Sequence, residues 1–212
     1  MQATEVTITY LQMLERDEAQ VPSSLPAGVK IERAAHASPE LARWLYATVG
    51  GPWYWYERLG WDREKWQEEL DEVGSEIWLL TVDGTPAGYC QLAAHIESSS
   101  GRISAETEIL YFGLMEFAQG KGLGKIFLQQ MIVNAWTLAE RHPLPSIGRV
   151  WVHTCTLDGP YALANYEARG LTSYGSSTEN VCLPAESLGS WQAMFATAPH
   201  SNLSDETHPS AG

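Results

Sequence analysis

A strand followed by a glycine-rich loop and a long helix constrains this chain more than any other stretch. The apolar run at residues 109–114 breaks at Met115-Glu116, and glycines then alternate at positions 120, 122 and 124. Glycine lets a backbone approach a ligand closely, and the first N–H groups of a helix are unpaired and electropositive. The stretch therefore predicts a site that binds phosphate.

The sequence behind the loop has the 3.6-residue period of an amphipathic helix. Its apolar residues fall on one face, and Pro143 and Pro145 end the pattern. Elsewhere, alternation and turn signals predict strands at 6–14, 29–34, 76–82, 86–96, 107–114, 149–156 and 171–183. Helices are expected to start at Ser38, Asp62 and Asp158-Gly159-Pro160, with Ser38 and Asp62 as N-caps and Gly170 ending the last one. Loops are expected at 15–28 and 97–104, and Asp83-Gly84 is a hairpin turn signal.

The length suits one domain with a small extension. The chain has 212 residues, of which 44% are hydrophobic, enough for a sizeable core. We expect a single domain over 1–195 and a disordered tail over 196–212, where apolar residues are scarce.

Composition argues against several classes of protein. No apolar run is long enough to span a membrane, and the first residues lack the pattern of a signal peptide. The formal net charge is -13 and the few Lys and Arg are scattered, which argues against nucleic-acid binding. The three cysteines and six histidines show no metal spacing, so no metal is expected. Buried or partly buried thiols in a reducing cytoplasm are the simplest interpretation.

The glycine loop does not fit the two best-known phosphate loops. A P-loop needs two glycines with four residues between them and then Lys-Ser/Thr, but Gly124-Lys125 is followed by Ile126. The dinucleotide fingerprint needs G-x-G-x-x-G after the first strand of a βαβ unit. Here the pattern is G-x-G-x-G, in the middle of the chain.

A third pattern fits. Residues 119–124, QGKGLG, match Q/R-x-x-G-x-G/A, and residues 162–171, ALANYEARGL, are similar to A-x-x-x-Y-E-x-x-G-F. Together with the element order, these motifs resemble the GNAT superfamily of acyl-CoA-dependent N-acetyltransferases over residues 6–183. The chain departs from the family pattern at Gly159, Glu116 and Leu171, where Asn, Pro and Phe are usual.

The resemblance implies a fold and a donor site. The fold would be α/β (α+β), with a mixed, mostly antiparallel sheet of six to seven strands, splayed at the fourth and fifth and flanked by about four helices. Acetyl-CoA would be the cosubstrate. The implied donor-binding residues are Phe112, Gly113, Leu114, Gln119, Gly120, Lys121, Gly122, Leu123, Gly124 and Lys125.

The resemblance also implies catalytic residues. Glu108 lies six positions before Leu114, as the catalytic glutamate does in several members, and would act as general base. Tyr166 matches the tyrosine that protonates the leaving thiolate. Glu106 shares the face of Glu108 by the period of two and would hold a cationic substrate or, as we expect, be solvated. A Cys155–His153 nucleophile pair lacks a third group and is not favoured.

The acceptor is indicated only by an aromatic segment. Trp53, Tyr54, Trp55 and Tyr56 either close the core or form a pocket wall, and the sequence leaves both open. His153 is a further candidate for the wall or an auxiliary base. A covered pocket suits a small-molecule primary amine. A non-catalytic acyl-CoA sensor and a protein or peptide acetyltransferase stay as alternatives, and so does a homodimer.

Overall fold

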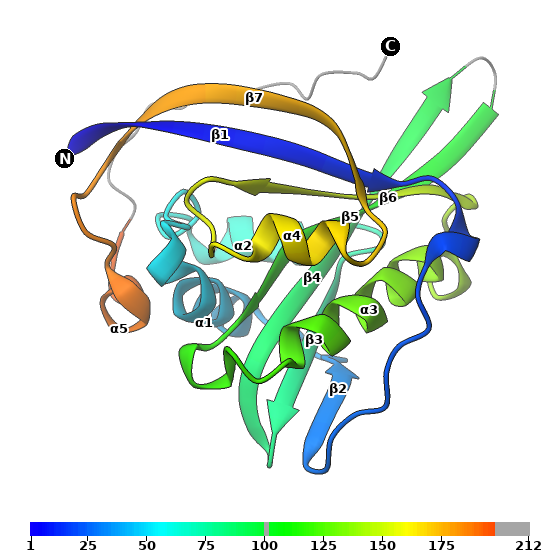
Figure 1. Ribbon diagram of the computed structural model, residues 1–212, viewed down its shortest axis with the longest axis horizontal. Coiled ribbons are helices and arrows are strands. Elements are labelled where there is room, and N and C mark those ends of the chain that lie inside the picture. The colour runs from blue at the N-terminus through cyan, green and yellow to red at the C-terminus, as the bar shows by residue number, and fades with distance from the viewer. Residues whose placement is uncertain (100–101, 198–212) are drawn as a thin grey trace.

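One seven-stranded sheet organises the molecule. The computed structural model describes residues 1–99 and 102–197, and the strands follow the order β2-β3-β4-β5-β6-β1-β7 (Figure 1). Only β5 and β6 pair in parallel; every other neighbouring pair is antiparallel. The strands are β1 Gln2–Met13, β2 Val29–Arg33, β3 Glu76–Val82, β4 Thr85–Ser99, β5 Arg102–Leu114, β6 Ile147–Cys155 and β7 Thr172–Leu183. The expected mixed sheet is confirmed.

Helices cover both faces of the sheet. The α-helices are α1 Pro39–Gly50, α2 Arg63–Asp71, α3 Leu123–Trp136, α4 Ala162–Glu167 and α5 Gly189–Ala193. One core cluster joins α3 and Tyr166 of α4 to the sheet, and a second joins α1, α2 and Ala193 of α5 to the other side. The family's expected layering is therefore present, with α5 as a short helix that the sequence did not predict.

Local signals explain where several elements begin and turn. Ser38 caps α1 by accepting a hydrogen bond from the Leu41 N–H at 3.3 Å, and Asp62 caps α2 through the Lys65 N–H at 2.9 Å. Asp83 and Gly84 have φ of 48° and 81°, as a tight hairpin between β3 and β4 requires. These predicted positions are confirmed.

The β4–β5 hairpin is longer than the sequence indicates. The loop expected at 97–104 is wrong: β4 continues to Ser99, β5 begins at Arg102, and Glu97 pairs with Ser104. Figure 1 shows these strand ends projecting from the sheet. The hydrogen-bond ladder between β4 and β5 continues into this segment and outweighs the low strand propensity of its serines.

The N-terminal strand lies inside the sheet. β1 pairs with β6 on one side, through Ile8 and Cys155, and with β7 on the other, through Val6 and Glu179. Its inner residues Leu11 and Met13 belong to the α3-side core. The two strands that come last in the sequence, β6 and β7, are therefore joined in the sheet by β1.

The described residues end within the expected tail. Most of the tail expected at 196–212 lies outside them, and the boundary at 195 stays a prediction. Among the described residues, no helix is long and apolar enough to cross a membrane.

Candidate active site

The sheet opens between β5 and β6, and a cavity occupies the opening. The parallel ladder runs only from Ala105 and Ile147 to Glu108 and Trp151. In the order of the sheet these are the fourth and fifth strands, as expected. Past the ladder, β5 lines a cavity of about 960 Å³ with six consecutive residues, 109–114.

A β-bulge marks the point where the strands part. Gln91 of β4 pairs with Tyr111 and Leu92 pairs with Ile109, so Leu110 has no partner on β4. A bulge bends a strand and re-aims its side chains and backbone groups. Here it turns both Leu110 and Tyr111 toward the α1-side core, while Phe112 packs on the α3 side. The backbone of β5 is thereby presented along the cavity.

The glycine loop joins the end of β5 to α3. Gly120 and Gly122 have φ of 71° and 75°, a region that favours glycine, and no atom lies within 4 Å of where their Cβ would stand. Gly122 is the N-cap of α3, and no side chain caps this helix. The first N–H groups of α3 are thus left for an anion, which fits the pyrophosphate expected there.

The predicted donor residues are divided between the cavity and the loop around it. Leu123 is buried in the core, and Lys121, Gly122 and Lys125 are exposed outside the cavity lining. Gln119 donates a hydrogen bond from Nε2 to the Leu114 carbonyl at 3.1 Å, which ties the loop to the strand. Of the ten predicted donor-binding residues, six line the cavity: Phe112, Gly113, Leu114, Gln119, Gly120 and Gly124.

Tyr166 reaches the cavity from α4. It is 6% exposed, and its ring lies 6.2 Å from that of Phe112 in an edge-on arrangement. Burial raises the pKa of its phenol well above the ordinary value of 10.0, and the charge of Asp158 acts in the same direction. The phenol is therefore fully protonated at neutral pH and is suited to donate a proton.

Glu108 lies beside the cavity rather than in its wall. The side chain is 3% exposed, and its two oxygens contact His153 Nδ1 at 3.2 Å and His95 Nε2 at 2.9 Å. Burial alone would raise the pKa of Glu108, but hydrogen bonds from the two imidazoles lower it to about 2. Glu108 is a carboxylate at any physiological pH, and His153, which does line the cavity, lies next to it.

Glu106 is not solvated as expected. It forms an ion pair with Arg149 in which the two side chains are only 16% and 17% exposed. Arg149 also hydrogen-bonds Gln12 and lies over the rings of Trp151 and Tyr174. Because Arg149 comes from the neighbouring strand, the period of two within β5 could not reveal it.

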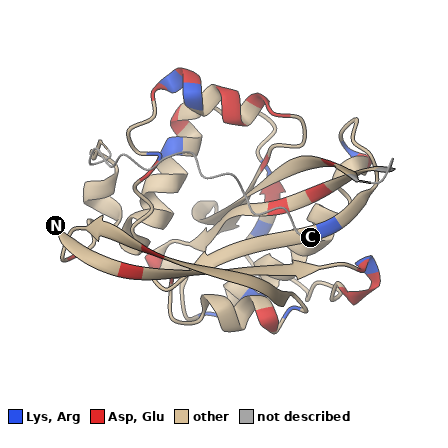
Figure 2. Cartoon of the chain, turned by 90° about the horizontal axis from the view of Figure 1, so that it is seen from above, with Lys and Arg blue, Asp and Glu red and all other residues tan. Residues whose placement is uncertain are grey.

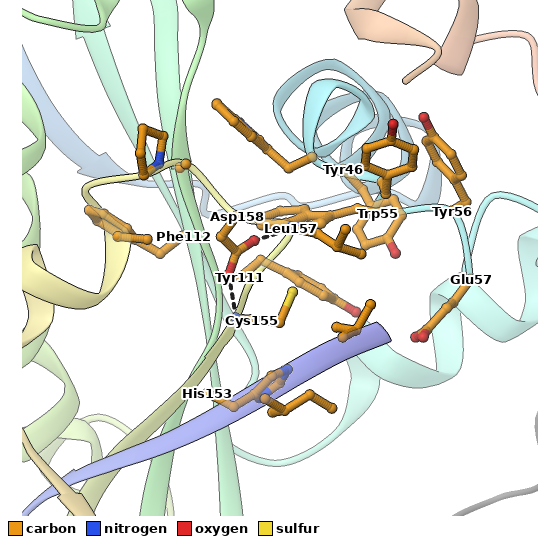
Figure 3. A pocket seen from close by; sticks show the side chains of 18 of the residues that line it. Tyr46, Trp55, Tyr56, Glu57, Tyr111, Phe112, His153, Cys155, Leu157 and Asp158 are labelled. Carbon is orange, nitrogen blue, oxygen red and sulfur yellow. Dashed lines mark hydrogen bonds between the residues drawn. The ribbon is translucent and has the colours of Figure 1, made fainter. Parts of the chain in front are cut away.

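The aromatic segment is both core and cavity wall. All four of its predicted residues line the cavity, from Trp53 to Tyr56. Tyr56 is 4% exposed, and its hydroxyl donates to the Gly51 carbonyl and accepts from the Leu188 N–H. Trp55 donates from Nε1 to Asp158 at 3.3 Å and lies against Tyr46 (Figure 3). The two alternatives left open by the sequence are therefore both realised.

Comparison with known proteins decides the family. A sequence model of the acetyltransferase (GNAT) family matches residues 39–171, well over half of the chain. The chain belongs to the GNAT acetyltransferase family. No curated protein matched it.

Solved GNAT structures share the fold at low sequence identity. A GCN5-related N-acetyltransferase from Kribbella flavida has a TM-score of 0.52 and 18% identity over 84% of this chain. One from Sphaerobacter thermophilus has a TM-score of 0.54 and 14% identity over 82% of this chain. The matches span 58% and 51% of those two proteins. An aminoglycoside acetyltransferase from an uncultured soil metagenomic sample, in complex with sisomicin, has a TM-score of 0.51 and 16% identity, covering 68% of this chain and 88% of that one.

Sequence reasoning missed several residues of this GNAT cavity. Arg58, 25% exposed at the side chain, lines it and lies over the rings of Trp61 and Tyr111. Asp158 accepts from Thr154, the Cys155 N–H and Trp55. Two sequence signals could have indicated these residues: Arg58 is a charged residue next to an aromatic segment, and Asp158 lies at the start of a predicted helix. No sequence signal pointed to the parts of β1 and β7 that line the cavity, which include Met1, Val6, Ile8, Val181 and Leu183.

Other features of this GNAT chain bear on its chemistry. Cys90 is buried and Cys155 partly buried, but Cys182 is exposed, contrary to expectation. Among residues 1–99 and 102–197, no group of three or more His, Cys, Asp or Glu could hold a metal ion. In the view of Figure 2, Lys and Arg are interspersed with Asp and Glu along the chain.

Proposed function

We propose that this protein transfers the acetyl group of acetyl-CoA to the primary amine of a small molecule by direct attack. The observation that carries the proposal is one cavity lined by β5, the glycine loop and Tyr166. In this proposal the loop and the N-terminus of α3 bind the pyrophosphate, with Lys121 and Lys125 nearby. The residues 112–114 run along the pantetheine arm.

Two side chains provide proton transfer in the proposal. Removal of a proton from the ammonium depends on the carboxylate of Glu108, and Tyr166 protonates the sulfur of the leaving CoA. Both roles agree with the proton affinities, because Glu108 is ionised and Tyr166 is neutral. Backbone N–H groups of β5 near the cavity polarise the carbonyl.

The cavity favours a small, partly apolar amine over a peptide. Trp53, Tyr54, Trp55 and Tyr56 cover it on one side, and side chains of β1 and β7 contribute on another. An extended peptide needs an open groove, whereas a covered cavity suits a compact acceptor. The structural similarity to an aminoglycoside acetyltransferase is consistent with a small-molecule acceptor.

The test has two stages. Calorimetry measures acetyl-CoA binding to the full chain, and free thiol is then followed with 2-phenylethylamine, putrescine, sisomicin and a peptide with a free N-terminus. We expect tight donor binding and thiol release with a small amine. Absence of donor binding would overturn the proposal, and binding without turnover on any amine would point to a sensor.

A further inference from the structure

Glu108 does not line the cavity, so it can exchange a proton with an acceptor there only through a water molecule or another side chain. The six residues that follow it on β5 line the cavity, but Glu108 does not. Both of its oxygens have an imidazole within hydrogen-bonding distance. A general base must lie within hydrogen-bonding reach of the proton that it takes, either directly or through one water molecule. His153 meets this condition, since it lines the cavity and its side chain is 42% exposed (Figure 3).

The contact with Glu108 decides which nitrogen of His153 carries the proton. An ionised carboxylate has no proton to donate, so the 3.2 Å contact favours the ring with its proton on Nδ1 of His153. In the neutral ring the lone pair is then on Nε2. No hydrogen bond to that nitrogen is made within the described part of the chain, so it is available to an acceptor amine.

We propose that His153 takes the proton of the acceptor ammonium, and that Glu108 acts as a positioning residue that fixes the tautomer and stabilises the imidazolium. The inference rests on the proposed function and refines it. An ammonium N–H bond breaks and an N–H bond forms at Nε2 of His153. The electron pair left on the amine attacks the thioester carbonyl.

The remaining protons balance the reaction. After the nitrogen of the tetrahedral intermediate has lost its second proton to water, the C–S bond breaks and Tyr166 protonates the sulfur, and His153 returns its proton to solvent. Tyr166 is reprotonated from solvent, and one proton is released overall for each acetyl group transferred.

The surroundings of His153 make it a stronger base than a free histidine. Burial favours its neutral form, but the hydrogen bond and charge of Glu108 outweigh burial and raise the pKa of His153. Asp158, from the loop after β6, acts in the same direction, and Arg58, from the aromatic side, opposes it. The other neighbours are the rings of Tyr10 on β1 and Trp151 on β6, and His95 on β4 shares the same carboxylate.

The first experiment determines the tautomer of His153 in the absence of an acceptor amine. Nitrogen-15 NMR of the full chain, with His153→Gln used to assign the signal, should show the neutral ring protonated at Nδ1. In Glu108→Gln the pKa of His153 should fall. A neutral ring protonated at Nε2, or an unchanged pKa in that variant, would overturn the proposal.

The second arm separates proton removal from packing. Thiol release is measured with 2-phenylethylamine and with a fluorinated analogue of the same shape whose amine is already neutral at the assay pH. For His153→Gln we expect a loss of about 100-fold with the first amine and less than about 10-fold with the second, because only the first needs a base before attack. His36→Gln, an exposed histidine outside the cavity, should leave both rates unchanged.

The pH profile adds a readout that packing alone would not change. In the parent, the rate should rise with pH as His153 loses its proton, and Glu108→Gln should move this rise to lower pH. Equal losses on both amines, or a parental rate in His153→Gln with an inactive Glu108→Gln, would overturn the role of His153. If the parent acetylates no amine, the proposed function fails, and the NMR arm still decides whether Glu108 holds the ring.

Discussion

Tyr166 keeps its proton because its side chain is buried in the α3-side core, edge-on to the ring of Phe112. Desolvation disfavours the phenolate, so the buried side chain donates a proton but does not accept one at neutral pH. At the scale of the residue, the proposed mechanism thus combines a neutral acid, Tyr166, with an ionised carboxylate, Glu108, that contacts the proposed base His153. Burial of the phenol and the imidazole contacts of the carboxylate reinforce the protonation states that these residue types have at neutral pH.

Replacing Tyr166 by Phe tests the acid. We expect turnover to fall by about 100-fold or more, the usual contribution of a general acid, while calorimetry finds nearly unchanged acetyl-CoA affinity. Tyr161→Phe is the matched control, since Tyr161 lines the same cavity but is 81% exposed. Equal turnover in the Tyr166 variant and the parent would remove Tyr166 from the mechanism.

Gly122→Ala tests the phosphate loop. Its Cβ would have open space in the structure, so any loss of acetyl-CoA affinity beyond backbone strain must come from crowding of the bound pyrophosphate. Gly84→Ala is the control, because Gly84 also has a positive φ and open space but lies in the β3–β4 turn. We expect similar thermal destabilisation of both variants and weaker donor binding only for Gly122→Ala. Parental donor affinity in Gly122→Ala would count against this loop as the site.

At the scale of the element, the packing of α1 on β5 determines one wall of the cavity. A Cβ on Gly113 would lie 2.4 Å from Val49 Cγ1, and a Cβ on Gly50 would lie 2.3 Å from the Trp55 ring. Glycine is therefore needed at both positions for close packing. Gly113, predicted as a donor-binding residue, has this structural requirement in addition to its place in the cavity.

The variant Gly113→Ala should lose about 1–3 kcal/mol of stability, as overpacked sites commonly do. Val49→Ala in the same chain should recover part of the loss, because it removes the methyl groups that clash. Chemical denaturation of the two single variants and the double variant measures the coupling. Additive losses would show that α1 and β5 adjust independently.

Elements with local signals could be predicted, and those that depend on strand register could not. The helix caps at Ser38 and Asp62 and the turn at Asp83-Gly84 depend only on neighbouring residues, so they could be predicted from short sequence patterns. The partners of Glu108 come from β4 and β6, and the bulge at Leu110 shifts the β4–β5 register. Motifs located the glycine loop and Tyr166, but no motif encodes the contacts of the Glu108 carboxylate with His95 and His153.

At the scale of the whole molecule, a buried carboxylate joins three parts of the α3 side. Glu76 of β3 accepts two hydrogen bonds from Arg141, which follows α3, and others from Arg33 of β2, His142 and Trp78. Burial raises its pKa, but these hydrogen bonds outweigh burial and lower it to about 2. The carboxylate therefore stabilises the fold only while it is ionised.

Acid should weaken this stabilisation in a defined range. Because the folded pKa of Glu76 lies below its ordinary value of 4.5, its contribution is complete above about pH 4.5 and is lost as pH falls toward 2. Glu76→Gln should cost about 3 kcal/mol at neutral pH, the low end for a broken buried pair, since Arg33 and Arg141 are partly exposed. Denaturation against pH should give a shallower acid slope in the variant, with the remaining slope partly due to Glu108. An unchanged slope would contradict this role.

The position of β1 has a consequence for the order in which the chain folds. Ile8 pairs with Cys155 and Gln2 with Leu183, so β1 can meet its partners only after the long segment between them has been made. Pairings this distant in sequence form slowly, and until then β6 presents an unpaired edge. Folding of this protein should therefore be slow and sensitive to aggregation during synthesis, with closure of the cavity between β5 and β6 among its last steps.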